Sequence, residues 1–239
     1  MKPKSVIKNL LKQSGLEVTK YPGSMLKKRL TLLNAQGVDL VFDVGANMGQ
    51  YASLMRRVGY TGRMYSFEPL GQAYAELVKL SDEDPTWEAV NIAVGDYDGE
   101  VEINISGGSA TSSSILDMMP QHVDTKPESV YVGKESVPIY KLDSIFWDYY
   151  TEGSKLLLKI DTQGFEKNVL EGARNVMDYV HGVQLEMSLV ELYKGEMLYR
   201  EMIDFLAEWG FSLQFVEPGF TEKTSGRLLQ MDGIFFREN

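Results

Sequence analysis

Glycines and acidic or amide side chains gather at two places where a nucleoside could bind. The first is Asp43-Val44-Gly45-Ala46-Asn47-Met48-Gly49, at the end of a short apolar run. Glycine in this segment would let a ligand approach the backbone at the N-terminus of the next helix. The second is Glu68-Pro69, about 20 residues later, where the carboxylate would accept hydrogen bonds from the two hydroxyls of a ribose. The expected ligand contacts are Asp43, Gly45, Ala46, Asn47, Gly49, Glu68 and Pro69.

The spacing of the glycines argues against two common nucleotide sites. A dinucleotide fingerprint has glycine at its first, third and sixth positions, but Asn47 and Gln50 occupy the last two here. No Lys-Ser/Thr pair follows, which excludes a phosphate-binding P-loop. The remaining features fit S-adenosylmethionine, because Asp43 would balance its positively charged aminoacyl end and Glu68 would bind its ribose. A glycine turn with two solvated acids and no ligand is the alternative interpretation.

Two further acids at the ends of predicted strands are candidates for catalysis. Asp161 follows the apolar run Leu156–Ile160, and Glu186 ends the next predicted strand. The carboxyl ends of neighbouring parallel strands meet at one edge, so the two carboxylates could face one cleft. Asp161, expected beside the cofactor's methyl group, would act as base or orienter for a hydroxyl, with Glu186 as the second candidate. Alternatively the pair would hold a divalent cation, cap a helix or pair with Lys159.

His122 is the third catalytic candidate. It lies in an irregular stretch, residues 106–134, that could fold over the cleft and bring an imidazole to the acceptor. A plain surface histidine is the alternative. The run Ser112-Ser113-Ser114 in the same stretch is either a flexible linker or a contact to the acceptor.

Strand and helix patterns alternate from residue 39 to residue 187. Short apolar runs bounded by glycine or proline predict buried strands, and apolar residues three and four apart predict helices. Strands are predicted over residues 39–44, 63–67, 87–94, 137–142, 156–160, 183–187, 211–216 and 228–236. Helices are predicted over residues 52–58, 73–80, 143–149 and 202–209, and through Val169 and Leu170. This order predicts an α/β fold: a mostly parallel sheet with helices on both faces and an antiparallel final pair.

The segment between residues 94 and 142 departs from this alternation. The turn Asp96-Tyr97-Asp98-Gly99, followed by alternating apolar residues over 101–105, predicts a hairpin appended to the sheet. Residues 106–134 show little periodicity, which predicts a long irregular loop over the site. Asp143 is placed to cap the following helix.

Composition and charge restrict the possible partners. The chain has 239 residues, 44% of them hydrophobic, which suits one domain over residues 38–239 with a helical arm over 1–37. It has no cysteine, no apolar run long enough to span a membrane and no signal-peptide core, so we expect a cytoplasmic protein. The net charge of −10 disfavours nucleic acid as the substrate. Residues 1–30 are basic, with an amphipathic pattern over 6–11 that predicts a capping helix or, alternatively, a membrane or polyanion contact.

Several motifs together resemble those of the FkbM methyltransferase family. They are Phe42-Asp43-Val44-Gly45-Ala46-Asn47-x-Gly49, Phe67-Glu68-Pro69, Asn91-x-Ala93-Val94-Gly95, Lys159-Ile160-Asp161-x-x-Gly164-x-Glu166 and Met231-Asp232-Gly233-Ile234-Phe235. The resemblance spans about residues 38–237 and is most specific in the block from Lys159 to Glu166. Where the family usually has Asp-Val-Glu-Gly, this chain has Asp161-Thr162-Gln163-Gly164, so a role that needs a charge at position 163 is in question.

The resemblance implies a Rossmann-like, seven-stranded domain that uses S-adenosylmethionine to methylate a hydroxyl on a sugar or natural product. By similarity, Asn91 and Ala93 join the cofactor-binding residues. Two other function classes remain open: a differently catalytic Rossmann-like enzyme such as a nicotinamide oxidoreductase, and a non-catalytic nucleotide-binding protein. A bound divalent cation is possible but not favoured, and the acceptor and the oligomeric state cannot be deduced from the sequence.

Overall fold

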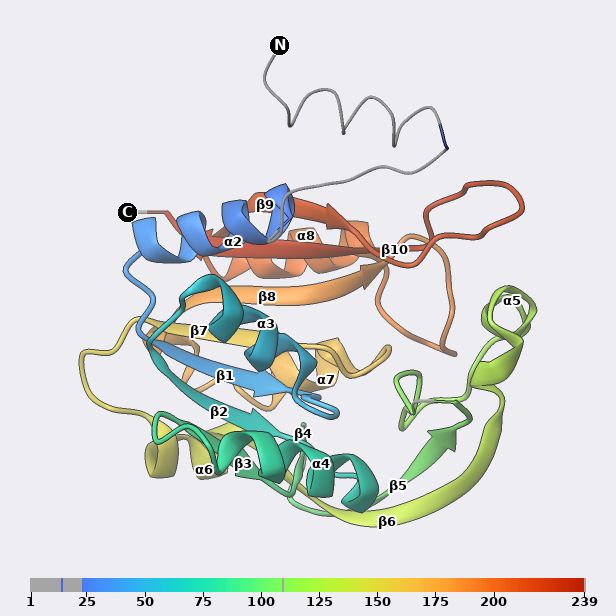
Figure 1. Cartoon of the computed structure of the whole chain (residues 1–239), viewed down its shortest axis with the longest axis horizontal. Helices are drawn as coiled ribbons and strands as arrows, with labels where there is room; N and C mark the ends of the chain where they lie inside the picture. Colours follow the sequence, from blue (N-terminus) through green and yellow to red (C-terminus); the bar gives the residue numbers. More distant parts are fainter. Residues whose placement is uncertain (1–13, 15–22, 109, 239) are drawn as a thin grey trace.

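The computed structural model describes residues 14, 23–108 and 110–238 (Figure 1). Seven strands form the main sheet in the order β3-β2-β1-β7-β8-β10-β9. These strands are β1 (Leu40–Val44), β2 (Arg63–Phe67), β3 (Trp87–Val90), β7 (Leu156–Ile160), β8 (Val180–Ser188), β9 (Phe211–Pro218) and β10 (Gln230–Arg237). β1 pairs in parallel with β2 and β7, while β10 is antiparallel to both β8 and β9. The predicted fold class, a mostly parallel Rossmann-like sheet with an antiparallel strand near its end, is confirmed.

Helices cover both faces of this sheet. On one face lie α2 (Ser24–Ala35), α3 (Gln50–Val58) and α4 (Gly71–Ser81), whose apolar side chains pack with Val41, Leu157 and Phe236. On the other face lie α6 (Leu142–Tyr149), α7 (Glu166–Glu171) and α8 (Tyr199–Glu208). The central strands β1 and β7 are buried along their whole length, as expected for strands covered on both faces.

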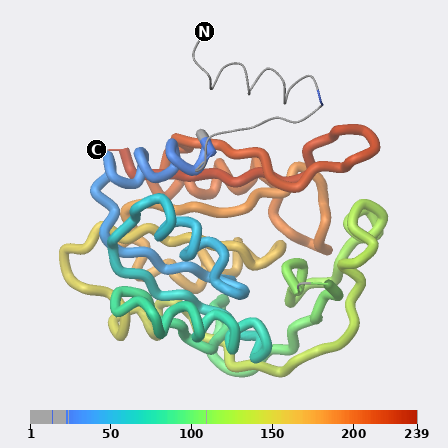
Figure 2. Tube along the Cα trace, viewed as in Figure 1, coloured from blue at the N-terminus to red at the C-terminus, as the bar shows by residue number. Residues whose placement is uncertain are grey.

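Helix α2 shares the core of the domain although it belongs to the predicted arm over residues 1–37. Leu33 is fully buried against the sheet, and Gln36 donates a hydrogen bond to Gln214 at 3.1 Å. Figure 2 shows this early helix beside the last strands of the chain. The amphipathic helix predicted over residues 6–11 lies outside the described residues.

Two predictions between residues 87 and 142, a single strand over 87–94 and a hairpin across the turn at 96–99, were wrong. The predicted strand 87–94 is interrupted by a turn in which Ile92 N donates to Val90 O, so β4 (Ala93–Gly95) joins a second sheet instead. That sheet has the order β4-β6-β5, with β5 (Gly99–Ser106) paired antiparallel to β6 (Tyr131–Lys141). The predicted hairpin across the turn at 96–99 is therefore absent from the described chain, because both its neighbours pair with a strand about 40 residues away.

The region predicted as an irregular loop is shorter and more ordered than expected. It contains α5 (Pro120–Thr125), a 3-10 turn (Pro127–Ser129) and the start of β6. In Figure 1, β5 and β6 extend beyond the main sheet and carry α5. Asp143 does not cap α6, because Lys141 is the N-cap residue and the Asp143 carboxylate accepts hydrogen bonds from Asn175.

None of the helices in the described part of the chain is long and apolar enough to cross a membrane.

Candidate active site

The carboxyl ends of β1, β2 and β7 meet at Gly45. Its backbone N–H donates to Phe67 O at 3.0 Å, and Asp161 N donates to Val44 O at 3.0 Å. Gly45 has φ of 75°, and a Cβ there would overlap the carbonyl oxygen of Asp161. Only glycine therefore permits this approach of the two loops.

A cavity of about 370 Å³ opens over these strand ends, which is a suitable size for a nucleoside. Its walls include Gly45, Ala46, Asn47, Glu68, Pro69, Ala93 and Asp161 among the residues predicted to bind cofactor. Apolar side chains such as Leu54, Ile92 and Phe165 supply further wall. The turn 110–115 closes it from the side of the second sheet. Gly49 lies outside the lining, where a Cβ would meet the Trp87 ring at 2.9 Å.

Glu68 lines the cavity, and backbone donors hold its carboxylate in place. Its Oε2 accepts a hydrogen bond from Asn47 N at 2.8 Å and its Oε1 accepts one from Leu70 N at 2.9 Å, and the residue is 4% exposed. Burial raises the pKa of Glu68 to about 7 despite these donors. Each carboxylate oxygen retains a lone pair that could accept from a ribose hydroxyl.

Asp43 and Asn91, like Gly49, are predicted cofactor contacts that lie outside the cavity lining. Asp43 is fully buried, with Oδ1 2.8 Å from Lys159 Nζ, and its other oxygen accepts from Ser66 Oγ at 3.3 Å. Asn91 donates to the backbone oxygens of Glu68 and Pro69, both at 2.9 Å. Asp43 can thus reach a ligand only through Lys159, which does line the cavity, and Asn91 supports the turn after β2.

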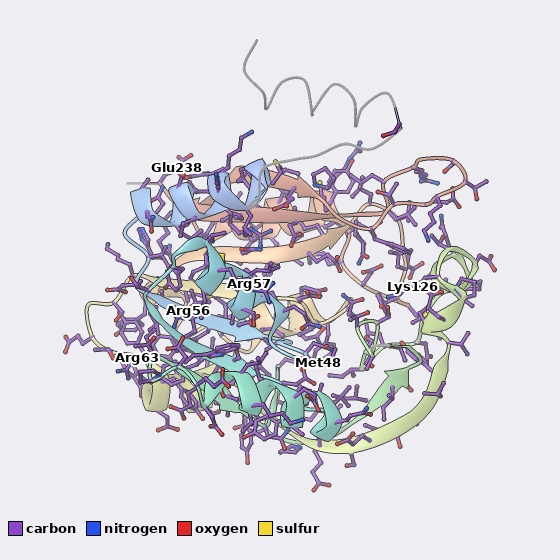
Figure 3. All side chains as sticks on the ribbon, in the orientation of Figure 1. Met48, Arg56, Arg57, Arg63, Lys126 and Glu238 are labelled. Carbon is purple, nitrogen blue, oxygen red and sulfur yellow. The ribbon has the colours of Figure 1, made fainter. Side chains whose placement is uncertain are left out.

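A second cavity of about 240 Å³ adjoins the first. Asp161, Gln163 and Thr111 line both cavities. Glu186, His122, Lys126, Ser112, Phe220 and Gln230 complete the lining of the second one. The structure thereby brings all three predicted catalytic residues to one space. In Figure 3, Lys126, which directly follows α5, and Met48, in the turn between β1 and α3, lie on the same side of the molecule, beyond the strand ends.

Gln163 joins the two carboxylates. Its Nε2 donates to Asp161 Oδ1 at 2.8 Å and to Glu186 Oε2 at 3.0 Å, while its Oε1 accepts from the Tyr193 hydroxyl at 2.7 Å. The backbone at Gln163 is left-handed, with φ of 56°. Sequence reasoning had noted only the missing charge at this position. What could have indicated the role of Gln163 is its side-chain amide donor, only two residues after the predicted strand-end acid Asp161.

The remaining motif residues hold this turn in place. Glu166 accepts hydrogen bonds from Thr162 N at 2.9 Å and from Gly164 N at 3.2 Å. Burial raises the pKa of Glu166 to about 7. Gly164 has φ of 97°, and a Cβ there would press on Tyr193. The glycine and the glutamate of the Lys159–Glu166 block therefore shape the turn that presents Asp161 and Gln163.

The surroundings of Glu186 and His122 shift the pKa of each side chain toward its neutral form. Burial and the nearby Asp161 charge raise the pKa of Glu186 well above its ordinary value. His122 is 2% exposed, and neither ring nitrogen has a hydrogen-bond partner among the described residues. Burial and the Lys126 charge lower the pKa of His122 to about 4, so the imidazole is neutral at pH 7. The alternative of a surface histidine is thus wrong.

No three His, Cys, Asp or Glu side chains in the described residues are grouped so that they could hold a metal ion. Asp161 Oδ2 lies 3.6 Å from Lys159 Nζ. The alternative role predicted for Asp161, an ion pair with Lys159, is therefore present as a long contact.

Comparison with known proteins matches residues 43–213 to the methyltransferase FkbM domain. A curated relative, the 2-O-methyltransferase NoeI of Sinorhizobium fredii (strain NBRC 101917 / NGR234), is 23% identical over 209 residues, covering 83% of this chain and 84% of the relative.

Two of the solved structures that align with this chain do so at low sequence identity. Magnesium protoporphyrin IX methyltransferase from Synechocystis PCC 6803, with bound SAM, aligns with a TM-score of 0.47 and 10% identity over 100% of this chain and 98% of that one. TehB from Haemophilus influenzae aligns with a TM-score of 0.49 and 8% identity over 97% and 67% of the two chains.

Proposed function

The chain belongs to the FkbM methyltransferase family, and on this premise we propose that it transfers a methyl group from S-adenosylmethionine to a hydroxyl of a sugar or natural-product small molecule. The relative named as a 2-O-methyltransferase supports oxygen as the acceptor atom. The acidic net charge of −10 supports a small acceptor over a nucleic acid.

The observation that carries this proposal is the shared wall of the two cavities. A methyl transferase needs a donor and an acceptor held in line, with their reacting atoms a few ångströms apart. The larger cavity has the size and the ribose-binding acid for the donor, and the smaller one has polar groups for a hydroxylated acceptor. Asp161 and Gln163 stand where the two meet.

The larger cavity would hold the cofactor through a few kinds of contact. Glu68 would accept from the ribose hydroxyls, and the glycine turn at 45–49 would let the ligand approach the backbone. Ile92, Ala93 and Phe165 offer apolar surface for the adenine ring. When bound, S-adenosylmethionine supplies an electrophilic methyl group on a sulfonium.

The acceptor hydroxyl must lose its proton as the new bond to carbon forms. Asp161, with 42% of its side chain exposed at the junction of the cavities, is the first candidate to accept that proton. Glu186 is the second, although its raised pKa makes it the better partner to hold a proton or donate a hydrogen bond. Neutral His122 can orient a further hydroxyl of the acceptor with a free ring nitrogen.

The proposal is tested by following tritium from the methyl group of labelled S-adenosylmethionine into a panel of glycosides, polyols and phenolic natural products. We expect label on an oxygen of at least one hydroxylated small molecule. Asp161→Asn should keep its affinity for S-adenosylhomocysteine within about threefold, yet lose turnover by about 10²-fold or more. Transfer to nitrogen or nucleic acid, cofactor binding with no transfer to any member of the panel, or unchanged turnover in Asp161→Asn would count against the proposal.

A further inference from the structure

Charged side chains of both signs gather around Tyr51 in the larger cavity. Arg29 Cζ lies 5.7 Å and Lys159 Nζ 5.4 Å from the centroid of the Tyr51 ring, and all three residues line the cavity. Asp232 of β10 lines it as well, and its charge acts on Arg29. We name Arg29, Tyr51, Lys159 and Asp232 the Tyr51 cluster. It lies toward β7, β8 and β10, whereas Glu68 follows β2 on the other side of β1.

Arg29 reaches this cavity from α2, which precedes the family-matched residues 43–213. Its Nη2 lies 2.6 Å from Glu217 Oε2, and the side chain is 11% exposed. The buried Nε has no hydrogen-bond partner among the described residues. Burial alone lowers the pKa of Arg29, but Tyr51, Asp232 and Glu217 outweigh it, so the pKa is raised and the guanidinium stays charged. A charged group with a free donor is therefore held at the cavity wall.

Asp232 supplies the opposite charge to the same cavity. Burial raises the pKa of Asp232, while Arg29 lowers it. Asp43, which had been expected to face the aminoacyl group, already has Lys159 Nζ at 2.8 Å and lies outside the cavity lining. Asp161 lines the cavity as well, but it stands at the junction with the smaller cavity, which leaves Asp232 for a positively charged ligand group at this end.

We propose that the Tyr51 cluster binds the amino-acid end of the cofactor, with Arg29 facing its carboxylate and Asp232 facing its ammonium. This inference rests on the cofactor named in the proposed function. An amino-acid zwitterion carries both charges within a few bonds, and burying it requires an opposite charge for each. The Tyr51 cluster offers a positive and a negative charge. Its charged residues lie outside the glycine turn at 45–49 and the Glu68-Pro69 motif, which would bind the nucleoside. Helix α2 then becomes part of the cofactor site.

Calorimetry with ligands that differ only at the amino-acid end tests this without any acceptor. S-adenosylhomocysteine carries the zwitterion and 5′-methylthioadenosine lacks it. We expect Arg29→Met to weaken binding of S-adenosylhomocysteine by about tenfold or more and binding of methylthioadenosine by less than about threefold. Decarboxylated S-adenosylmethionine, compared with S-adenosylmethionine, separates the charges: Arg29→Met should weaken only the ligand with the carboxylate, and Asp232→Asn should weaken both.

Two control variants separate recognition from structure. Lys28→Met removes an exposed cation from the same helix and should leave all affinities within about threefold. Glu217→Gln breaks the ion pair of Arg29 outside the cavity lining and should keep the affinity ratio of the two ligands within about threefold. Equal weakening of both ligands in Arg29→Met, or unchanged affinity for S-adenosylhomocysteine, would overturn the inference. A wild-type protein that binds neither ligand would instead overturn the cofactor assignment itself.

Discussion

At the scale of single residues, the site depends on how three side chains share hydrogen bonds. Gln163 donates to Asp161 and Glu186 through one nitrogen, and Tyr193 fixes which way its amide faces. The oxygens of Asp161 and Glu186 that face Gln163 both accept hydrogen bonds, so the NH₂ group of the amide must lie on their side. The neutral amide thereby holds two acids at the junction of the cavities without adding a third charge. This arrangement explains why a chain with Gln at position 163 can keep the site.

Cofactor binding should depend on the ionisation of Glu68. Its pKa is raised to about 7, so it is charged above that pH and gains a proton as the pH falls through 7. The charged form accepts hydrogen bonds better, and affinity for S-adenosylhomocysteine should therefore drop by about three- to tenfold from pH 8 to pH 6. Calorimetry across this range measures it, with Glu68→Gln expected to bind weakly and with a flatter pH dependence. A flat wild-type curve would contradict the role of Glu68.

Residue types near strand ends made most of the site residues predictable. They did not reveal which other side chains those residues contact. Gly45, Glu68, Asp161 and Glu186 could be placed from the alternation of apolar runs and turns. The burial of Asp43 against Lys159 and the position of Arg29 in the cavity wall could not be predicted, because both depend on packing between elements far apart in the chain. Such contacts leave no local periodicity to detect.

At the scale of elements, the site depends on the close approach of the loops after β1 and β7. Gly45→Ala should cost several kcal/mol of unfolding free energy, because a left-handed residue gains a Cβ that overlaps the Asp161 carbonyl. Gly37→Ala is the matched control, with φ of 71° and no atom within 4 Å of the added Cβ, and should cost only about 1 kcal/mol. Urea unfolding measures both. Equal losses would show that the approach of the two loops is not constrained.

The second sheet shows where element-level prediction fails. Alternation over residues 101–105 correctly indicated a strand, but its partner was β6 and not the strand before the turn. Pairing partners depend on which apolar faces meet in the folded core, and Ile103 and Ile139 meet there with the helices of one face. The strands of the main sheet were easier to predict because each is a short apolar run with clear boundaries.

At the scale of the whole molecule, helix α2 and the last strands pack into one core around the cavities. Leu33 is fully buried and packs in the same core as Phe236. Leu33→Ala should therefore lower the unfolding free energy by about 2–5 kcal/mol while unfolding stays a single transition. Urea unfolding followed by tryptophan fluorescence tests this. An unchanged midpoint would mean that α2 is an independent arm, as the division at residue 37 had suggested.

In the proposed function, the two adjoining cavities hold donor and acceptor on either side of Asp161 and Gln163. A crystal structure of the protein with S-adenosylhomocysteine tests this most directly. We expect the ribose at Glu68, the amino-acid end at Arg29 and Asp232, and the sulfur facing the smaller cavity beside Asp161. A ligand whose sulfur faces away from Asp161, or one bound outside the larger cavity, would contradict the account.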